Sequence, residues 1–189
     1  KRYAPLYYRS QDRLVTLEDY KGHANRFASN YGSTGKAAAV VRRAFSSANV
    51  IDLFVLEKAS DTQLRRATQE YKKQLLESVQ PKKMLTDEVV VVDGLIRTLD
   101  LFLVVTLDSN YKLGQNQIIQ SVRRLTQQYF DVGNTDFGET FIPQDLIRYV
   151  LDNETNIRFA RVDNVESPIS VGFNEIIQLN NLSITTAFV

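Results

Sequence analysis

The sequence contains no cysteine and only one histidine, His23, in 189 residues. Without cysteine there is neither a disulfide framework nor a thiolate metal site. A single histidine also provides too few ligands for a typical metal site, which draws on several His or Cys side chains. His23 falls on the polar face of a predicted helix, so a solvated surface histidine is favoured over a catalytic one. We predict no metal site.

No excess of charge of either sign is present, because 23 basic and 22 acidic residues leave a net charge of +1. This balance argues against nucleic acid or an anionic membrane as the main partner. Basic pairs such as Arg42-Arg43 and Lys82-Lys83 alternate along the chain with acidic residues, which favours scattered solvated charges over a nucleic-acid stripe. No apolar run approaches the ~20 residues that span a bilayer, and no signal peptide is visible.

The length predicts one domain, or one domain with lobes, and allows roughly 70% of the unfolded surface to be buried. An apolar fraction of 43% and a charged fraction of 24% are typical of soluble globular proteins. The first residue is Lys1 rather than Met, so we expect a fragment or a processed product.

The stretch from Thr16 to Tyr31 predicts a capped helix over about Leu17 to Ser29. Thr16 is an N-cap residue type, and Asp19 three residues later completes an acidic capping box. Apolar residues recur at helical spacing after the cap, which predicts one buried face. Asn30 and Gly32 are stop signals.

Two strands and a second helix are predicted next. Lys36 to Phe45 is alanine-rich and therefore ambiguous, but its shortness and the flanking glycines favour a strand. Val50 to Glu57 is apolar on both faces apart from Asp52, which is typical of a strand in the middle of a sheet. Ser60 to Gln63 reads as another capping box, starting a helix that Pro81 ends.

The second half of the chain continues with alternating elements. Val89 to Val92 predicts a short strand before an Asp93-Gly94 turn. Thr98 to Asp108 predicts a long strand whose leucines and Val105 share one face. Gln115 to Phe130 predicts the third helix, and Pro143 begins a short fourth helix that reaches about Leu151. Further strands are expected over Ile157 to Val162, Ile169 to Phe173 and Leu182 to Phe188.

This element order predicts the α+β class and a ferredoxin-like, split βαβ fold. The expected core is a four-stranded antiparallel sheet with both long helices on one face. An N-terminal helix–strand precedes it, and Ile169 to Phe173 pairs with Leu182 to Phe188 in a C-terminal β-ribbon. The corresponding lobes are residues 1–49, 50–163 and 164–189.

Motifs that carry chemistry are weak in this sequence. Gly32 to Lys36 resembles a phosphate loop, but the glycine gap is too short and the loop follows a helix, so a plain connection is favoured. Asp87 with Glu88, or Asp100 with Asp108, provide carboxylate pairs for acid–base work, yet an exposed strand face is the favoured interpretation. We predict no catalytic residue and no cofactor.

The two ends of the chain are the predicted interaction surface. Tyrosine beside arginine is typical of protein interfaces, and the lead-in combines the two. Packing of this lead-in against a preceding part of the protein is an equal alternative. The C-terminal strand is uncharged, and an open edge of that kind favours pairing with another chain. The candidate interface residues are Tyr3, Leu6, Tyr7, Tyr8, Leu182, Ile184 and Phe188.

Several segments together resemble the baseplate J-like family of contractile phage tails. Arg13 to Tyr20 matches the family's R-x-V-T-x-E-D-Y signature, and Lys36 to Arg43 matches a following strand of small and basic residues. Leu75 to Lys83 matches a helix ending in a basic-proline segment, and Asn174 to Ile184 matches an N-E-I-x-x-L-x-x-I-x-I element. The resemblance extends over about Arg13 to Thr185.

The resemblance implies a structural wedge protein of the virion tail baseplate, assembled in the host cytoplasm and without enzymatic activity. It implies self-association as a homodimer or ring, contacts with other wedge proteins around a central hub, and rearrangement on tail contraction. Nucleic acid and membrane are not implied as partners. The alternative from another functional class is a small-ligand or nucleotide-binding regulatory domain, since ferredoxin-like sheets host many such functions.

Overall fold

The fold is taken from a computed structural model, which describes residues 13–43, 49–107 and 114–189. The chain forms two compact units. Unit 1 comprises Lys1–Ser60, Leu64–Leu95 and Phe173–Glu175, and unit 2 comprises Asp61–Gln63, Ile96–Gly172 and Ile176–Val189. The division into lobes at residues 1–49, 50–163 and 164–189, expected from the sequence, stays a prediction.

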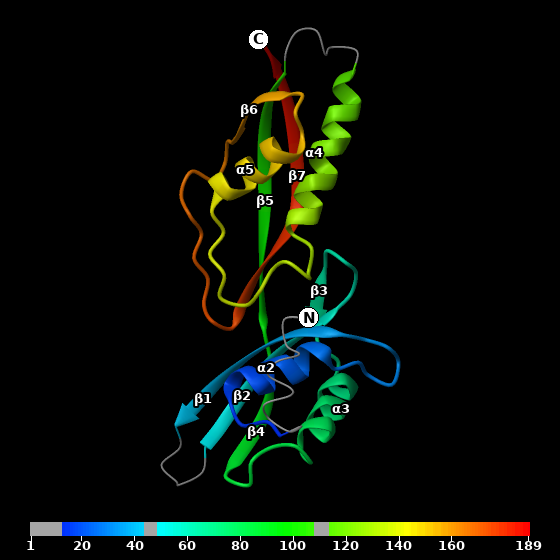
Figure 1. The fold of residues 1–189 in the computed structure, drawn as a ribbon, viewed down its shortest axis with the longest axis vertical. Coiled ribbons are helices and arrows are strands. Elements are labelled where there is room, and N and C mark those ends of the chain that lie inside the picture. The colour runs from blue at the N-terminus through cyan, green and yellow to red at the C-terminus, as the bar shows by residue number, and fades with distance from the viewer. Residues whose placement is uncertain (1–12, 44–48, 108–113) are drawn as a thin grey trace. The chain divides into compact units, whose positions relative to one another are not determined.

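Helices and strands alternate irregularly along the chain (Figure 1). In order they are α2 (Leu17–Arg26), β1 (Gly35–Arg43), β2 (Asn49–Lys58), β3 (Leu64–Arg66), α3 (Gln69–Val79), β4 (Asp87–Asp93), β5 (Leu95–Leu107), α4 (Gln115–Tyr129), α5 (Pro143–Asn153), β6 (Ile157–Val162) and β7 (Glu175–Phe188). This content confirms the predicted α+β class.

The sheet of unit 1 is built around β2, as the apolar character of that strand predicted. β1 pairs with β2 in the antiparallel sense along its whole length. On the other side, β4 pairs in parallel with the first part of β2, and β3 pairs antiparallel with its end. Alternate residues of β2 pack against α2 and α3, so both helices cover one face of this sheet. The buried apolar cluster comprises Leu14, Tyr20, Ala24, Ala37, Ile51, Leu53, Val55, Ala67, Tyr71, Leu75, Val79 and Val89.

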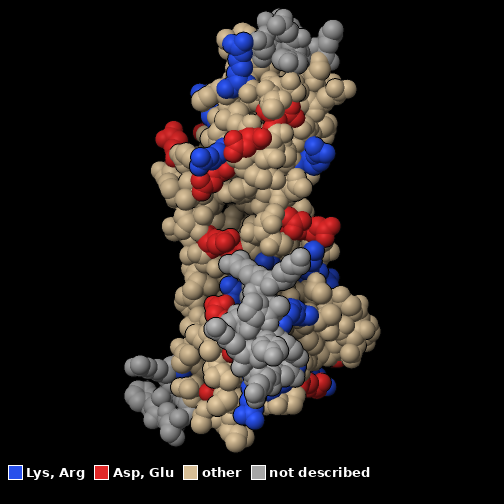
Figure 2. Space-filling model, viewed as in Figure 1, with Lys and Arg blue, Asp and Glu red and all other residues tan. Residues whose placement is uncertain are grey.

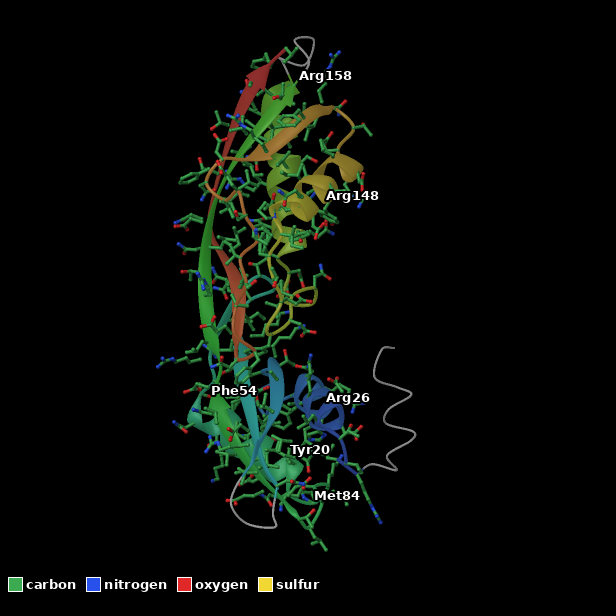
Figure 3. The ribbon with its side chains drawn as sticks, turned by 90° about the vertical axis from the view of Figure 1, so that its left-hand side faces the viewer. Tyr20, Arg26, Phe54, Met84, Arg148 and Arg158 are labelled. Atoms are coloured by element: carbon green, nitrogen blue, oxygen red, sulfur yellow. The ribbon has the colours of Figure 1, made fainter. Side chains whose placement is uncertain are left out.

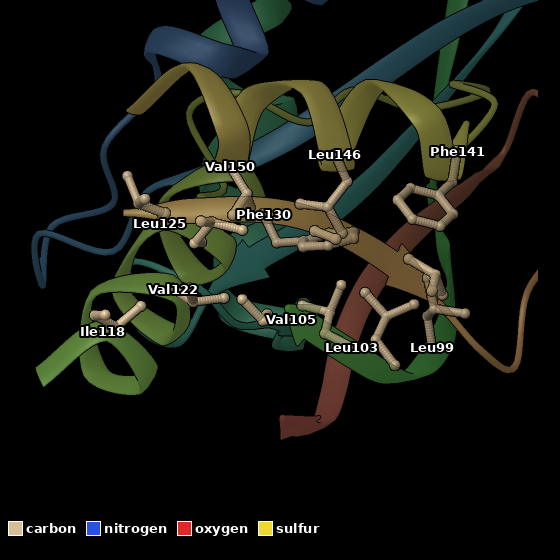
Figure 4. Packing of buried hydrophobic residues seen from close by; sticks show 14 of the residues in the cluster. Leu99, Leu103, Val105, Ile118, Val122, Leu125, Phe130, Phe141, Leu146 and Val150 are labelled. Atoms are coloured by element: carbon tan, nitrogen blue, oxygen red, sulfur yellow. The ribbon is translucent and has the colours of Figure 1, made fainter. Parts of the chain in front are cut away.

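Unit 2 contains a three-stranded sheet in the order β6-β5-β7. The predicted alternation in β5 is confirmed, because its odd-numbered residues from Leu99 to Leu107 are all buried. They pack against α4 and α5, which lie on the same side of the sheet (Figure 3). Figure 4 shows this core, in which Leu99, Leu103, Val105, Ile118, Val122, Leu125, Phe130, Phe141, Leu146 and Val150 are labelled.

Halfway along β7, the side chains that face the core switch from odd-numbered to even-numbered residues. Ile177 and Leu179 pack against the core, and so do Leu182 and Ile184, so the inward-facing residues switch from odd to even numbers. The extra residue at Asn180 and Asn181 therefore acts as a β-bulge. The Asp100 carboxylate of β5 accepts hydrogen bonds there from Asn180 Nδ2 at 2.9 Å and from the Asn181 N–H at 3.1 Å.

The ferredoxin-like sheet predicted from the sequence does not form. Its four strands are divided between two sheets, and β2 and β4 run parallel rather than antiparallel. The physical reason lies at Gly94, where a turn was expected. The Gly94 N–H donates to Val55 O and the Leu95 N–H donates to Asn174 O, so the chain passes from pairing with β2 to pairing with β7 without reversing.

The predicted capping box at Ser60 to Gln63 is wrong. Leu64–Arg66 forms β3, and the helix begins only after Thr68, whose hydroxyl accepts from the Tyr71 N–H at 3.2 Å. The buried Glu57 carboxylate accounts for this later start, because it accepts from Arg65 and from the Thr68 N–H.

The C-terminal β-ribbon is also wrong, whereas the N-terminal helix–strand is confirmed as α2 and β1. Ile169 instead exchanges two backbone hydrogen bonds with Phe141. Residues 182–188 continue β7, which pairs with β5. The Val189 N–H donates to Leu107 O near one end of this pair, so β5 and β7 run in the same direction. The strand therefore belongs to the sheet of unit 2.

Candidate interaction surfaces

The predicted interface residues differ in how the structure places them. Tyr3, Leu6, Tyr7 and Tyr8 lie outside the described residues. Leu182 and Ile184 are half-buried and pack against the core of unit 2, while Phe188 is 39% exposed at the end of β7. The three C-terminal residues thus share one strand, and part of each side chain is still accessible.

The outward face of the unit 2 sheet carries exposed aromatic residues that the sequence analysis did not single out. Phe102 is 50% exposed and Phe159 is 56% exposed. β6 pairs with β5 so that Phe159 lies opposite Thr106 and Arg161 lies opposite Val104. Phe102, Val104 and Phe159 therefore share one face of the sheet, with Val104 between the positions of the two aromatic residues. The outward-facing positions of β5 were expected to be polar, and Phe102 is an aromatic residue at one of them. This exception was the signal that could have identified the surface.

The glycine-rich loop has a structural role. Gly32 adopts a positive φ of 78°, and the Ser29 N–H donates to Ser33 O across the turn. A Cβ on Gly35 would lie 2.3 Å from Leu56 O and 2.8 Å from the Tyr71 hydroxyl, so close strand packing requires glycine at this position. These contacts fit a helix–strand connection.

His23 is half-buried and joins two helices. Its Nε2 lies 2.9 Å from Ser78 Oγ, which itself donates to Leu75 O. The contact links α2 to α3 and differs from the solvated surface position that the sequence predicted. The reason is that α2 lies against α3 on one side of the sheet, an arrangement that the sequence pattern does not contain.

The acidic residues that were candidates for acid–base work do not form pairs in the described structure. Asp87 is buried and accepts a hydrogen bond from the Tyr20 hydroxyl at 2.9 Å, whereas Glu88 is exposed. Figure 3 shows Tyr20 beneath α2, at the same end of unit 1 as Met84. Burial and then the Asp87 carboxylate raise the pKa of Tyr20 above its ordinary range. Asp100 holds the β7 bulge, and Asp108 lies outside the described residues.

Two further carboxylates of unit 1 are buried next to arginine. Glu57 is 2% exposed and lies 2.8 Å from Arg65 Nη2. Burial by itself raises the pKa of Glu57, but hydrogen bonds from Arg65, Ser33 and the Thr68 N–H outweigh it and lower the pKa. Asp52 pairs with Arg42 at 2.8 Å through Oδ2. Both pairs contribute to the packing of β2.

Charged residues are distributed rather than concentrated. Figure 2 shows basic and acidic side chains interspersed on the face that it presents. Ion pairs such as Lys72–Asp93 at 3.0 Å and Arg161–Asp163 at 2.8 Å join neighbouring charges of opposite sign. The described residues contain no group of three or more metal-ligating side chains placed to hold an ion. None of their helices combines the length and the apolarity needed to cross a bilayer.

A hollow of about 500 Å³ in unit 2 bears on ligand binding. It is lined by Tyr129, Asn134, Thr135, Glu139, Thr140 and Tyr149. Burial and then the carboxylates of Asp145 and Glu139 raise the pKa of Tyr129. Two tyrosine hydroxyls and one carboxylate provide hydrogen-bonding groups for a small polar ligand.

Comparison with known proteins gives a likeness of fold. No protein-family model and no curated protein matches the sequence. A chain in the six-fold symmetrised cryo-EM structure of the anti-feeding prophage baseplate matches with a TM-score of 0.56 and 10% sequence identity. The match covers 95% of this chain and 40% of that chain, so this chain spans about two fifths of its length.

Proposed function

We propose that this chain is a non-enzymatic structural component of a contractile-tail baseplate. The observation that carries the proposal is the fold match over 95% of the chain to a component of a baseplate structure. The sequence resemblance to the baseplate J-like family points independently to the same kind of assembly. The segment of this chain that matches R-x-V-T-x-E-D-Y has a clear structural role, because Thr16 and Asp19 form the capping box that starts α2.

Within this class, the chain corresponds to the C-terminal part of a wedge protein, similar to the inner-ring wedge protein of T-even-type phages. In this role it associates with itself, contacts other wedge proteins and helps to link wedges into a ring around the hub of the virion tail. It rearranges when the tail contracts. The distributed charge of the surface is compatible with protein partners.

The solution mass of the purified chain over a dilution series tests self-association. We expect a mass that falls from dimer to monomer on dilution through the micromolar range. A mass that stays monomeric at every concentration would contradict the self-associating wedge. Immunogold labelling of purified tails tests location, and label restricted to the sheath or the capsid would contradict the baseplate role.

A small-ligand or nucleotide-binding regulatory domain is the alternative, and the hollow beside Tyr129 and Tyr149 is the observation that favours it. Thermal unfolding with and without nucleotides separates the two functions, because a ligand at a hundred times its dissociation constant stabilises the folded state by about 2.7 kcal/mol. The structural role predicts no shift. A clear upward shift, abolished by Tyr149→Ala and retained by Tyr31→Ala, would support the alternative.

A further inference from the structure

The hollow beside Tyr129 and Tyr149 rests on the packed core of unit 2. Tyr129 ends α4 and Thr140 lies just before α5, and each is followed by a buried phenylalanine. The rings of these two residues, Phe130 and Phe141, have centroids 5.5 Å apart, and both lie in the core (Figure 4). Core packing therefore positions the wall of the hollow, which a binding site requires.

Two tyrosine rings form the aromatic part of this wall. Tyr129 from α4 and Tyr149 from α5 have ring centroids 5.6 Å apart and an angle of 56° between their planes. Both side chains are half-buried, so part of each remains accessible from the hollow. The face of a tyrosine ring has a negative electrostatic potential and attracts a cation within about 6 Å of its centre.

A turn presents the Glu139 carboxylate to the same hollow. Gly138, just before it, has a φ of 73°, and Glu139 Oε2 accepts from the Asp136 N–H at 2.9 Å. This hydrogen bond orients the carboxylate. No described residue donates a hydrogen bond to Oε1, and the Glu139 side chain is exposed. A carboxylate has lone-pair sites for about four hydrogen bonds, so most of its accepting capacity is available to a ligand.

The charge at the hollow is negative. None of the described residues that line it is basic, and Arg148, which is next to Tyr149 in the sequence, is exposed and is not part of the lining. A nucleotide phosphate would meet the Glu139 carboxylate, and like charges disfavour its binding. The hollow is therefore complementary to a cation.

The hollow is also open to solvent, because the lining residues Asn134, Glu139 and Thr140 are exposed. Sites for free small molecules usually bury most of the ligand surface. An open hollow with a charged rim is better suited to a side chain that enters from a neighbouring protein.

We propose that the hollow beside Tyr129 and Tyr149 receives an arginine side chain of a neighbouring protein chain. The guanidinium group stacks on a tyrosine ring and donates two parallel hydrogen bonds to the Glu139 carboxylate. Lysine is less suitable, because its ammonium group is a point charge that cannot stack and pair in a planar fork at the same time. The proposal rests on the proposed function in one respect, since it takes the neighbour to be another baseplate protein.

A single arginine side chain is the first probe. We expect N-acetyl-arginine methylamide, titrated into the 189-residue chain, to shift the NMR amide signals of residues 138–140 and Tyr149 saturably in the millimolar range. The citrulline analogue has the same shape without the charge, and the lysine analogue has the charge without the fork. Both should bind about five-fold more weakly or worse.

Substitutions assign the binding to the hollow. Glu139→Gln removes the charge and keeps an oxygen for the Asp136 N–H, and it should weaken binding of the arginine probe about ten-fold. Tyr149→Leu should also weaken it, through loss of the ring. The matched control is Glu166→Gln, an exposed carboxylate of unit 2 outside the lining, which should leave binding unchanged.

Incorporation into tails tests whether the arginine belongs to a protein neighbour. Glu139→Lys should lower the amount of the chain in purified tails about ten-fold, measured by mass spectrometry, because it places a cation where the guanidinium binds. Glu166→Lys is the control and should be incorporated like the native chain.

Several results would overturn the proposal. These are the absence of saturable shifts, equal binding of the citrulline or lysine analogue, undiminished binding by Glu139→Gln, tighter binding of a nucleotide at the same residues, or normal incorporation of Glu139→Lys. Each of them leaves the baseplate role standing if the native chain is found in the baseplate. A native chain absent from tails would instead overturn the proposed function, whether or not the hollow binds the arginine probe.

Discussion

Unit 1 and unit 2 have cores of different chemistry. Among the described residues, the buried polar side chains Asp19, Ser29, Asp52, Glu57 and Asp87 all belong to unit 1, and unit 2 buries only Thr126. Thr126 donates to Val122 O within α4, so even this hydroxyl bonds inside its own helix. The core of unit 2 therefore depends on apolar packing, whereas that of unit 1 also depends on hydrogen bonds and charge.

This difference predicts how each unit responds to change. An apolar core loses stability mainly when volume is removed, because the cavity that remains is only partly filled by relaxation. A core with buried polar groups also loses stability when a hydrogen-bond partner is removed or when the pH changes the charge of a carboxylate. Hydrogen exchange measured separately on peptides of the two units distinguishes these responses.

The largest expected effect is the loss of apolar volume in unit 2. Leu103→Ala, at a fully buried position of β5, should lower the free energy of unfolding by roughly 2 to 5 kcal/mol. Chemical denaturation measures this change in the free energy of unfolding, and hydrogen exchange in β5 and β6 locates it in unit 2. Thr98→Ala, at an exposed position of the same strand, is the control and should stay within about half a kcal/mol. Equal effects at the two positions would refute the assigned faces.

The second expected effect tests a polar contact of unit 1. Tyr20→Phe removes the hydroxyl that donates to the buried Asp87 carboxylate, and it should cost about 1 to 3 kcal/mol. Tyr31→Phe is the matched control, because Tyr31 is 85% exposed and should change stability very little. If both variants melt like the native chain, the buried polar groups of unit 1 do not limit its stability.

Local patterns in the sequence predicted the elements better than their assembly. The capping box of Thr16 and Asp19, the central position of β2 and the alternation of β5 are each encoded by neighbouring residues, and the structure confirms them. The alternation works because one face of β5 is covered by helices, which leaves a period of two in the side chains. The same reasoning found α4 and α5 within a few residues.

Pairing between distant strands could not be predicted in this way. Asp93-Gly94 has the residues of a turn, yet hydrogen bonds to Val55 and Asn174 hold the chain extended there. The direction of β4 beside β2 depends on a long-range choice that no local signal contains. The interface predictions share this limit, because the inward turn of Leu182 and Ile184 depends on the bulge that Asp100 stabilises from another strand.

A third prediction concerns acid, which should affect unit 1 before unit 2. The pKa of Glu57 is lowered in the folded state, so its contribution to stability is present above the ordinary value of 4.5 and is lost as the pH falls through the folded value. Exchange in β2 and α3 should therefore accelerate in this range, while exchange in β5 and α4 changes less. Glu57→Gln should reduce this dependence on pH, and an unchanged profile in the variant would assign the effect to other groups.

The smallest effect in this series concerns the cap of α2. The Thr16 hydroxyl accepts from the Asp19 N–H at 3.2 Å and donates to Asp19 Oδ2 at 2.9 Å. Thr16→Ala removes both contacts, but the N–H groups of Thr16 and Val15 continue to bond the Asp19 carboxylate. We therefore expect a loss of about 1 kcal/mol, the usual cost of an N-cap deletion.

The effect of the cap should be confined to unit 1, because α2 packs on β1 and β2. Thr16→Ser keeps a hydroxyl at the same position and should restore most of the lost stability. Faster exchange in α2 with unchanged exchange in α4 is the expected pattern for Thr16→Ala. Equal acceleration in both helices would mean that the two units unfold together, and the contrast between their cores would then not translate into separate stabilities.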